Sequence, residues 1–181
     1  MVCGRDTAAS AQEIQIYRQL MRITLICVGR AKAAAEQEIC DAYLKRARGS
    51  GRKLGFSQIE IVTVETSRAP SAQLRMAQEY QRLAKRVPSG AHRIVLDEKA
   101  QSLSSEDFAG RLAAVRDSGV RDLVFLIGGP DGLAPALREE AEEQLSLGAQ
   151  TWPHLLVRAM LAEQIFRGVA ILSGHPYHRG G

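Results

Sequence analysis

The chain has 181 residues, of which 45% are hydrophobic and 24% charged, with a formal net charge of +4. This is the size and composition of one globular domain with its own core. No apolar run approaches the roughly 20 residues of a bilayer span, and the N-terminus carries no apolar signal region. An aromatic content of 5% argues against a protein that reads RNA mainly by base stacking.

The charge balance is mildly basic, with a pI of about 9.2. It suits a phosphate-rich partner such as nucleic acid, although surplus Lys and Arg on a solvated surface would give the same value. The three cysteines are Cys3, Cys27 and Cys40. Their number is odd and no Cys-x-x-Cys pair occurs, so neither a disulfide framework nor a zinc site is predicted. We therefore expect a cytoplasmic protein without a metal.

The first twenty residues are polar, rich in Ala and Ser, and without a sustained period. Met21 then opens an apolar run that ends at Gly29, the pattern of a buried strand followed by a turn. We expect a single domain over 21–181, with 1–20 as an extension outside its core. The alternative is a short helix over 13–20 that packs on the domain.

Strands and helices are expected to alternate along the rest of the chain. Runs typical of strands are 23–28, 59–64, 93–96, 123–127 and a short one at 149–152; runs typical of helices are 33–47, 72–86, 105–117, 135–145 and 154–171. The strands are continuous apolar runs, as in a sheet that is buried on both sides. We expect an α/β fold, a parallel sheet with helices on both faces, and a flexible basic loop at 49–57.

A glycine-rich segment, Leu-Ile-Gly-Gly-Pro-Asp-Gly at 126–132, follows one of these strands. Ligands of open α/β sheets bind at the carboxyl ends of strands, and Gly128 and Gly129 let the backbone approach a ligand closely. The segment is neither a P-loop nor the dinucleotide fingerprint. A tight strand-to-helix turn without a ligand is the alternative.

Two further features lie at the C-terminal end. The irregular segment 146–154 can offer backbone N–H and C=O groups to a flat heterocycle, or it is a plain connection. The helix expected at 154–171 is apolar over much of its circumference, which exceeds one core-facing stripe and predicts a homodimer. Within it, Glu163 and Arg167 have the spacing of an ion pair.

The tail after this helix concentrates chemically useful side chains. It reads His175-Pro176-Tyr177-His178-Arg179. An imidazole can move a proton near neutral pH, a phenol can stack or hydrogen-bond, and a guanidinium can clamp a phosphate. A disordered basic end is the alternative.

These segments occur together and in order: LIGGPDG (126–132), TWPH (151–154), Arg158, LAEQ (161–164) and HPYHR (175–179). In this combination the chain resembles the RlmH family of SPOUT methyltransferases over about 21–179. That family methylates N3 of a pseudouridine in large-subunit (23S) ribosomal RNA. The resemblance implies a trefoil knot in the C-terminal half, a homodimer, and S-adenosylmethionine as methyl donor.

The resemblance also assigns residues to roles. Those that would hold the cofactor, largely through backbone contacts, are Leu96, Gly128, Gly129, Leu147, Gly148, Ala149, Gln150, Thr151 and Trp152. His178 or His175 would accept the N3 proton or orient its acceptor. Tyr177 and Arg179 would hold the nucleotide, and no metal is needed.

The chain departs from the family's pattern at two positions. Gln150 stands where an apolar residue is expected, and Gly174 where Asn is common. Two other functions stay open: a non-catalytic ribosome-associated RNA-binding module with the same fold, and an α/β enzyme with another nucleotide cofactor.

Overall fold

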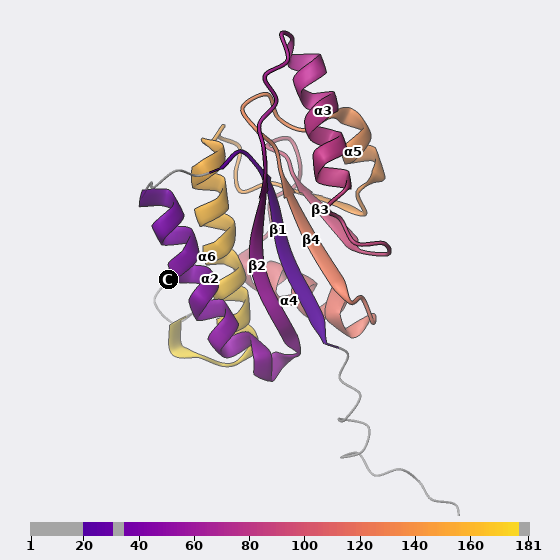
Figure 1. Ribbon diagram of the computed structural model, residues 1–181. Coiled ribbons are helices and arrows are strands. Elements are labelled where there is room, and N and C mark those ends of the chain that lie inside the picture. Colours follow the sequence, from indigo (N-terminus) through magenta and orange to yellow (C-terminus); the bar gives the residue numbers. More distant parts are fainter. Residues whose placement is uncertain (1–19, 31–34, 178–181) are drawn as a thin grey trace, which may run out of the picture.

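A five-stranded parallel sheet forms the centre of the molecule (Figure 1), with strand order β2-β1-β4-β3-β5. The computed structural model describes residues 20–30 and 35–177. The strands are β1 (Met21–Val28), β2 (Phe56–Val64), β3 (His92–Leu96), β4 (Asp122–Ile127) and β5 (Glu143–Leu145). The helices are α2 (Ala35–Gly51), α3 (Ala72–Ala84), α4 (Ser105–Asp117), α5 (Pro135–Glu140) and α6 (His154–Leu172), with a 3₁₀ turn η2 (Arg52–Leu54).

Helices cover both faces of the sheet, as the apolar strand runs predict. Alternate residues of β1 enter opposite core layers: Leu25 packs with side chains of α2, α4 and α6, whereas Ile26 packs with Leu83 of α3 and Leu137 of α5. Such two-sided burial is the reason why the strands read as continuous apolar runs. The expected α/β class is therefore confirmed.

The apolar circumference of α6 has a cause within the same chain. The helix packs against α2 and α4, and the residues it buries there include Leu161, Ala162, Ile165 and Phe166. Most of the surplus that predicted a homodimer is thus core. The homodimer stays a prediction, and Met160 is only half-buried and lines a pocket between α6 and the start of α4.

Three local expectations are wrong. The helix expected over 135–145 ends at Glu140, and residues 143–145 form β5, which pairs with β3. The short strand expected at 149–152 is instead irregular. The stretch 49–57 is no flexible loop, because α2 continues to Gly51, which packs on Phe56 and Ile59, and a 3₁₀ turn leads into β2.

No helix in the two described ranges is both long and apolar enough to cross a bilayer. Of the N-terminal extension, residues 1–19 lie outside the described ranges, so its separation from the core stays a prediction.

Candidate cofactor and active site

A cavity of about 650 Å³ opens at the carboxyl ends of β3, β4 and β5. Its volume is within the roughly 300–1,000 Å³ that is usual for small-molecule sites. Three segments form its walls: 96–99 after β3, 127–133 after β4, and most of 145–154 between β5 and α6. The cavity thus lies at the edge of the sheet where parallel α/β folds bind ligands.

The structure brings the expected cofactor residues together. Eight of the nine line this cavity: Leu96, Gly128, Gly129, Leu147, Gly148, Gln150, Thr151 and Trp152. The ninth, Ala149, is exposed and does not line it. Four charged residues that the sequence interpretation did not single out also contribute to the walls: Asp97, Glu98, Lys99 and Arg138.

A sharp turn closes the glycine-rich segment after β4. The Gly132 N–H donates to the Gly129 carbonyl at 2.9 Å, and Gly132 has a φ of +83°. A Cβ at position 128 would lie 2.6 Å from the backbone carbon of Gly132. The turn therefore requires a glycine at 128 because the two backbone strands touch.

Glycine is required at position 129 for a reason other than the expected close approach to a ligand. A Cβ there would point away from the cavity, to 3.0 Å from Val28 Cγ1 and 3.2 Å from Glu79 Oε2. The close approach that these glycines permit is to the protein's own atoms. Glycine at 128 and 129 shapes the turn, and both residues line the cavity.

An arginine fork attaches this turn to α3. Arg75 donates from Nε and Nη2 to the two carboxylate oxygens of Asp131, at 2.7 and 2.8 Å. The hydrogen bonds from Arg75 hold the pKa of Asp131 below its usual value. On the opposite wall, Arg138 Nε lies 2.8 Å from Asp97 Oδ2, an ion pair without the angle of a hydrogen bond.

The loop after β5 is fixed by its own side chains. Ser146 Oγ donates to the Gly148 carbonyl at 2.8 Å, and the Gly148 N–H donates back to Ser146 Oγ at 3.1 Å. Gly148 has a φ of +124°, which a residue with a side chain rarely adopts. Across the cavity mouth, Thr151 Oγ1 donates to Glu98 Oε2 at 2.7 Å. The two walls are therefore joined at the rim.

Two residues at the start of α6 were missed as site residues. His154 lines the cavity, and burial, followed by the nearby Arg158 charge, lowers its pKa. Arg158 is 1% exposed, and its Nη2 donates to the carbonyls of Val28 and Gly29 at 2.5 and 2.9 Å. His154 thus presents a neutral imidazole to the cavity at neutral pH. Both residues stand in the family segments of the sequence, His154 in TWPH and Arg158 by itself, so the sequence did contain a signal for them.

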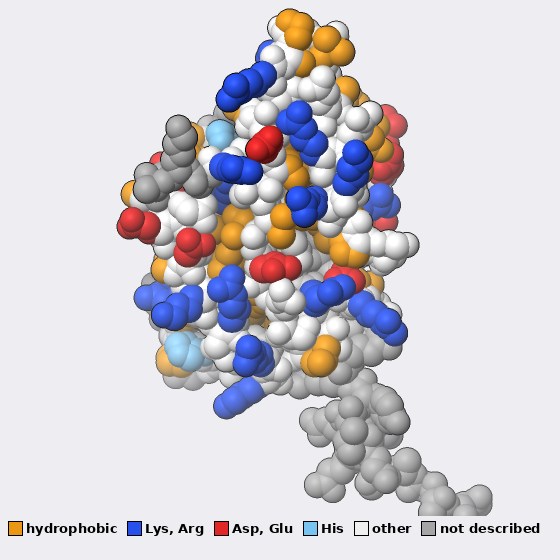
Figure 2. Space-filling model, viewed as in Figure 1, with side chains coloured by type: hydrophobic (Ala, Val, Ile, Leu, Met, Phe, Trp, Pro, Cys, Tyr) orange, Lys and Arg blue, Asp and Glu red, His pale blue; other side chains and the backbone are white. Residues whose placement is uncertain are grey.

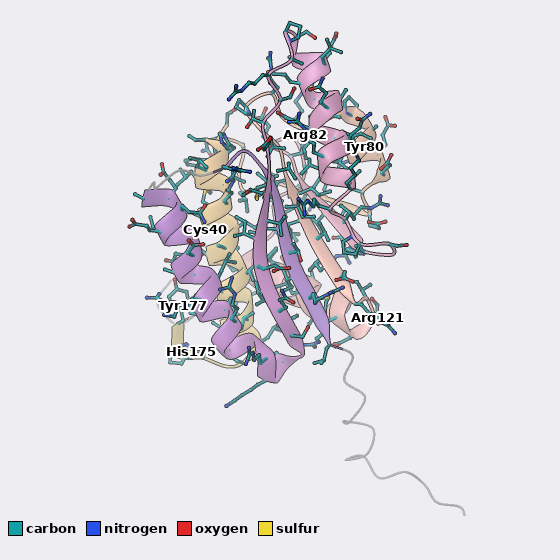
Figure 3. The ribbon with its side chains drawn as sticks, viewed as in Figure 1. Cys40, Tyr80, Arg82, Arg121, His175 and Tyr177 are labelled. Atoms are coloured by element: carbon teal, nitrogen blue, oxygen red, sulfur yellow. The ribbon has the colours of Figure 1, made fainter. Side chains whose placement is uncertain are left out.

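The described part of the tail lies against the side of α6 and does not line the cavity. The Tyr177 hydroxyl donates to Glu163 Oε1 at 3.2 Å, and its ring lies 4.6 Å from that of Phe166. Burial, then the Tyr43 hydrogen bond, raises the pKa of Tyr177 to about 12. His175 is exposed. Figure 3 shows both residues beside the ends of α2 and α6 that lie away from the α3 end of the molecule.

The two other expected tail residues, His178 and Arg179, lie outside the described residues. The expected ion pair within α6 is present, since Arg167 Nη2 lies 2.7 Å from Glu163 Oε1. Among residues 20–30 and 35–177, no three His, Cys, Asp or Glu side chains are grouped as they would be around a metal ion.

The sequence profile of a family described as "Predicted SPOUT methyltransferase" matches residues 21–178. The chain therefore belongs to the SPOUT methyltransferase family. Membership carries the expectation of a trefoil knot around the cavity loops, in addition to the parallel sheet seen here.

Individual proteins of known name are similar to this chain over most of its length. The chain is 50% identical to "Ribosomal RNA large subunit methyltransferase H" of Xanthobacter autotrophicus over 159 aligned residues. The aligned residues make up 88% of this chain and 99% of that protein. The protein of the same name from Rhodopseudomonas palustris is 48% identical over the same shares. A crystal structure of a probable methyltransferase from Bordetella pertussis covers 82% of this chain and 95% of that chain, with a TM-score of 0.46 and 14% identity.

Proposed function

We propose that this protein transfers the methyl group of S-adenosylmethionine to N3 of a pseudouridine in large-subunit ribosomal RNA. The carrying observation is the cavity at the carboxyl ends of β3, β4 and β5, which gathers eight of the nine expected cofactor residues in one place. The names of the relatives, which match over nearly their full length, support ribosomal RNA as the substrate. The N3 specificity rests on the family resemblance of the motifs.

The residues present fit the cofactor. Glycines at 128, 132 and 148 keep the loops in conformations in which a Cβ would be strained or would clash, so a flat ring such as adenine can approach the loop backbone closely. Apolar side chains of Leu96 and Leu147 face the same space. When bound, S-adenosylmethionine supplies an activated methyl group on a sulfonium. The residues around it therefore have to align the acceptor nitrogen, which is mainly a task of proximity.

The acceptor nitrogen also has to lose a proton. We propose His178 or His175 as the group that accepts or directs this proton, with Tyr177 and Arg179 holding the nucleotide. Because His175 and Tyr177 lie along α6 and outside the cavity walls, we further propose a homodimer in which each tail serves the cavity of the other copy. His154 is the competing candidate, because its imidazole already lines the cavity.

Transfer of a labelled methyl group to ribosomal particles that lack the modification tests this function. Deleting residues 175–181 should abolish transfer while the fold and S-adenosylmethionine binding remain. A truncated protein that methylates at the wild-type rate would refute the role of the tail. Ribosome binding without any transfer would identify the non-catalytic binding module, and binding of adenine nucleotides in place of S-adenosylmethionine would identify another class of enzyme.

Single substitutions separate the candidate residues. His178→Ala should lower turnover by roughly 10²–10⁴-fold, the loss expected for a general base, with little change in KM. Arg179→Ala should instead raise KM, and the fold increase should be larger at low salt, because a phosphate contact weakens as salt increases. If His154→Ala has the larger effect on turnover, the proton acceptor lies in the cavity wall and our assignment to the tail is wrong.

The dimer has its own test. At S-adenosylmethionine concentrations too low to fill a cavity whose turn is distorted by Gly128→Ala, mixing such chains with tail-deleted chains should restore methyl transfer, because one mixed dimer holds one intact cavity and one intact tail. Failure to regain activity, in a mixture shown to exchange subunits, would contradict a shared site.

A further inference from the structure

Helix α3 and the loop before it form a basic projection next to the cavity. We propose that this segment, residues 66–86 and here called the α3 arm, binds the phosphate backbone of the RNA around the target nucleotide. The inference rests on the proposed function for the identity of the RNA. The arm has five Lys or Arg residues and one acidic residue, a net charge of +4, which equals that of the whole chain.

The surface of the arm carries no exposed anion. Its one acidic residue, Glu79, is 2% exposed, and its Oε1 accepts from the Ser67 N–H at 2.8 Å. Three of the cations, Arg68, Lys85 and Arg86, are exposed, and none of them forms an ion pair within the described ranges. A solvated protein surface normally intersperses both signs, so one-signed charge here points to an anionic partner.

The side chain of Arg75 links the loop of the arm to the cavity wall. The Arg75 fork that holds Asp131, a cavity-lining residue, also donates from Nη1 to the Ala69 carbonyl at 3.1 Å. Arg68 is the neighbour of Ala69 in the chain. In Figure 1, α3 and its preceding loop stand beyond the carboxyl ends of β1 and β2, the end at which the cavity opens. Phosphates bound there would flank a nucleotide in the cavity.

The loop of the arm is held in one conformation by α3. Arg82 Nη1 donates to the Glu65 carbonyl at 2.7 Å, and Ser67 Oγ donates to Gln78 Oε1 at 2.7 Å. The Ala69 N–H donates to Ser67 Oγ at 3.1 Å. Because the backbone is already fixed, binding would order only the exposed side chains, which lowers the entropy cost.

A second basic surface provides a matched control. Residues 45–53 contain five Lys or Arg and no acidic residue. They end α2 and form η2, which leads into the amino end of β2, so they lie at the edge of the sheet opposite the cavity. Figure 2 shows blue side chains both in the upper part of the molecule and in its lower part. The position of the cavity favours the α3 arm as the surface that meets the substrate.

The experiment compares two triple variants that each remove three exposed charges. The arm variant is Arg68→Gln with Lys85→Gln and Arg86→Gln. The control is Lys45→Gln with Arg52→Gln and Arg121→Gln; Arg121 is an exposed residue directly before the amino end of β4 and so lies at the same end of the sheet. Arg75 and Arg82 stay unchanged because they hold the loop. Affinity for unmethylated large ribosomal subunits and for intact ribosomes is measured by filter binding at several salt concentrations, and S-adenosylmethionine affinity by calorimetry.

The arm variant should bind ribosomal particles about tenfold or more weakly. The slope of log affinity against log salt should fall in magnitude by about 2 to 3, since each phosphate contact contributes roughly 0.7–0.9. The control variant should retain the wild-type slope, and both should bind S-adenosylmethionine like the wild type. If the arm triple fails to fold by circular dichroism, the double variant Lys85→Gln with Arg86→Gln should show about two thirds of the change in slope.

An arm variant with wild-type affinity and slope would overturn the inference, as would a control variant that loses as much. A wild type that binds ribosomal particles through the arm but transfers no methyl group would refute the proposed activity alone. A wild type that neither binds nor methylates them would refute both.

Discussion

Gly128→Ala tests whether the turn after β4 holds the cofactor. The added Cβ would lie 2.6 Å from Gly132 C and 2.7 Å from Gly132 O, about 0.8 Å inside ordinary contact, which begins at 3.4 Å. Both atoms are backbone, so the turn has to open. Overpacking of this kind costs about 1–3 kcal/mol. If binding of S-adenosylmethionine requires the closed turn, its Kd should rise by about 5- to 150-fold, at 1.4 kcal/mol for each factor of ten.

Isothermal calorimetry measures this change, with Gly110→Ala as the control. Gly110 is an exposed residue inside α4, and a Cβ there meets nothing within 4 Å. Alanine should stabilise the helix by roughly 0.5–1 kcal/mol and leave the Kd unchanged. A folded Gly128→Ala protein with wild-type affinity would refute the placement of the cofactor, and an equal loss in the control would show that the effect is not local.

Three other outcomes are expected. A chain that begins at Met21 should keep the melting temperature and methyl-transfer rate of the full chain; a loss of several degrees would show that the extension packs on the fold. Met160→Asp should weaken self-association in light scattering, whereas Phe166→Asp, at a position 7% exposed, should unfold the protein; a wild type that is monomeric at micromolar concentration would contradict the dimer. The pKa of His154 is lowered from 6.5, so its contribution to stability is complete above about pH 6.5 and declines as the pH falls toward the lowered pKa; a thermal-unfolding pH profile that His154→Asn leaves unchanged would contradict this.

The sheet could be predicted because the apolar residues of its central strands, β1 and β4, are buried on both faces. In β4, Phe125 and Val124 are both fully buried but belong to opposite core layers, and a run of this kind indicates a central strand. The cavity followed from the same reasoning, since carboxyl ends of parallel strands share one edge of the sheet.

The end of α5 could not be predicted from local pattern. Residues 139–144 are all Glu, Ala or Gln, which favour a helix, yet 143–145 pair with β3. Glu143 contacts His92 of β3 and Arg111 of α4. These partners lie more than thirty positions away in the sequence, so tertiary contacts override the propensity.

The chemistry at the start of α6 was missed for a similar reason. Charged residues are rarely buried without a partner, so an arginine on an apolar helix does not by itself indicate a buried site residue. The partners of Arg158 are the backbone carbonyls of Val28 and Gly29. A backbone acceptor cannot be recognised from a pattern of side chains in the sequence. The position of the tail could not be predicted from the sequence either, because it depends on which side of α6 Tyr177 packs against.

The order of the strands has a consequence for biosynthesis. β1 emerges first but pairs with β4, whose Asp122 accepts from Arg22 across 100 positions, and Arg158 reaches back 130 positions to Val28. Until α6 has been synthesised, the apolar residues of β1 lack part of their cover. Contacts so distant in sequence make folding slow, and the incomplete chain exposes apolar surface. The nascent protein should therefore reach its native core only as translation ends, and its early strand is a natural client for chaperones at the exit of the ribosome.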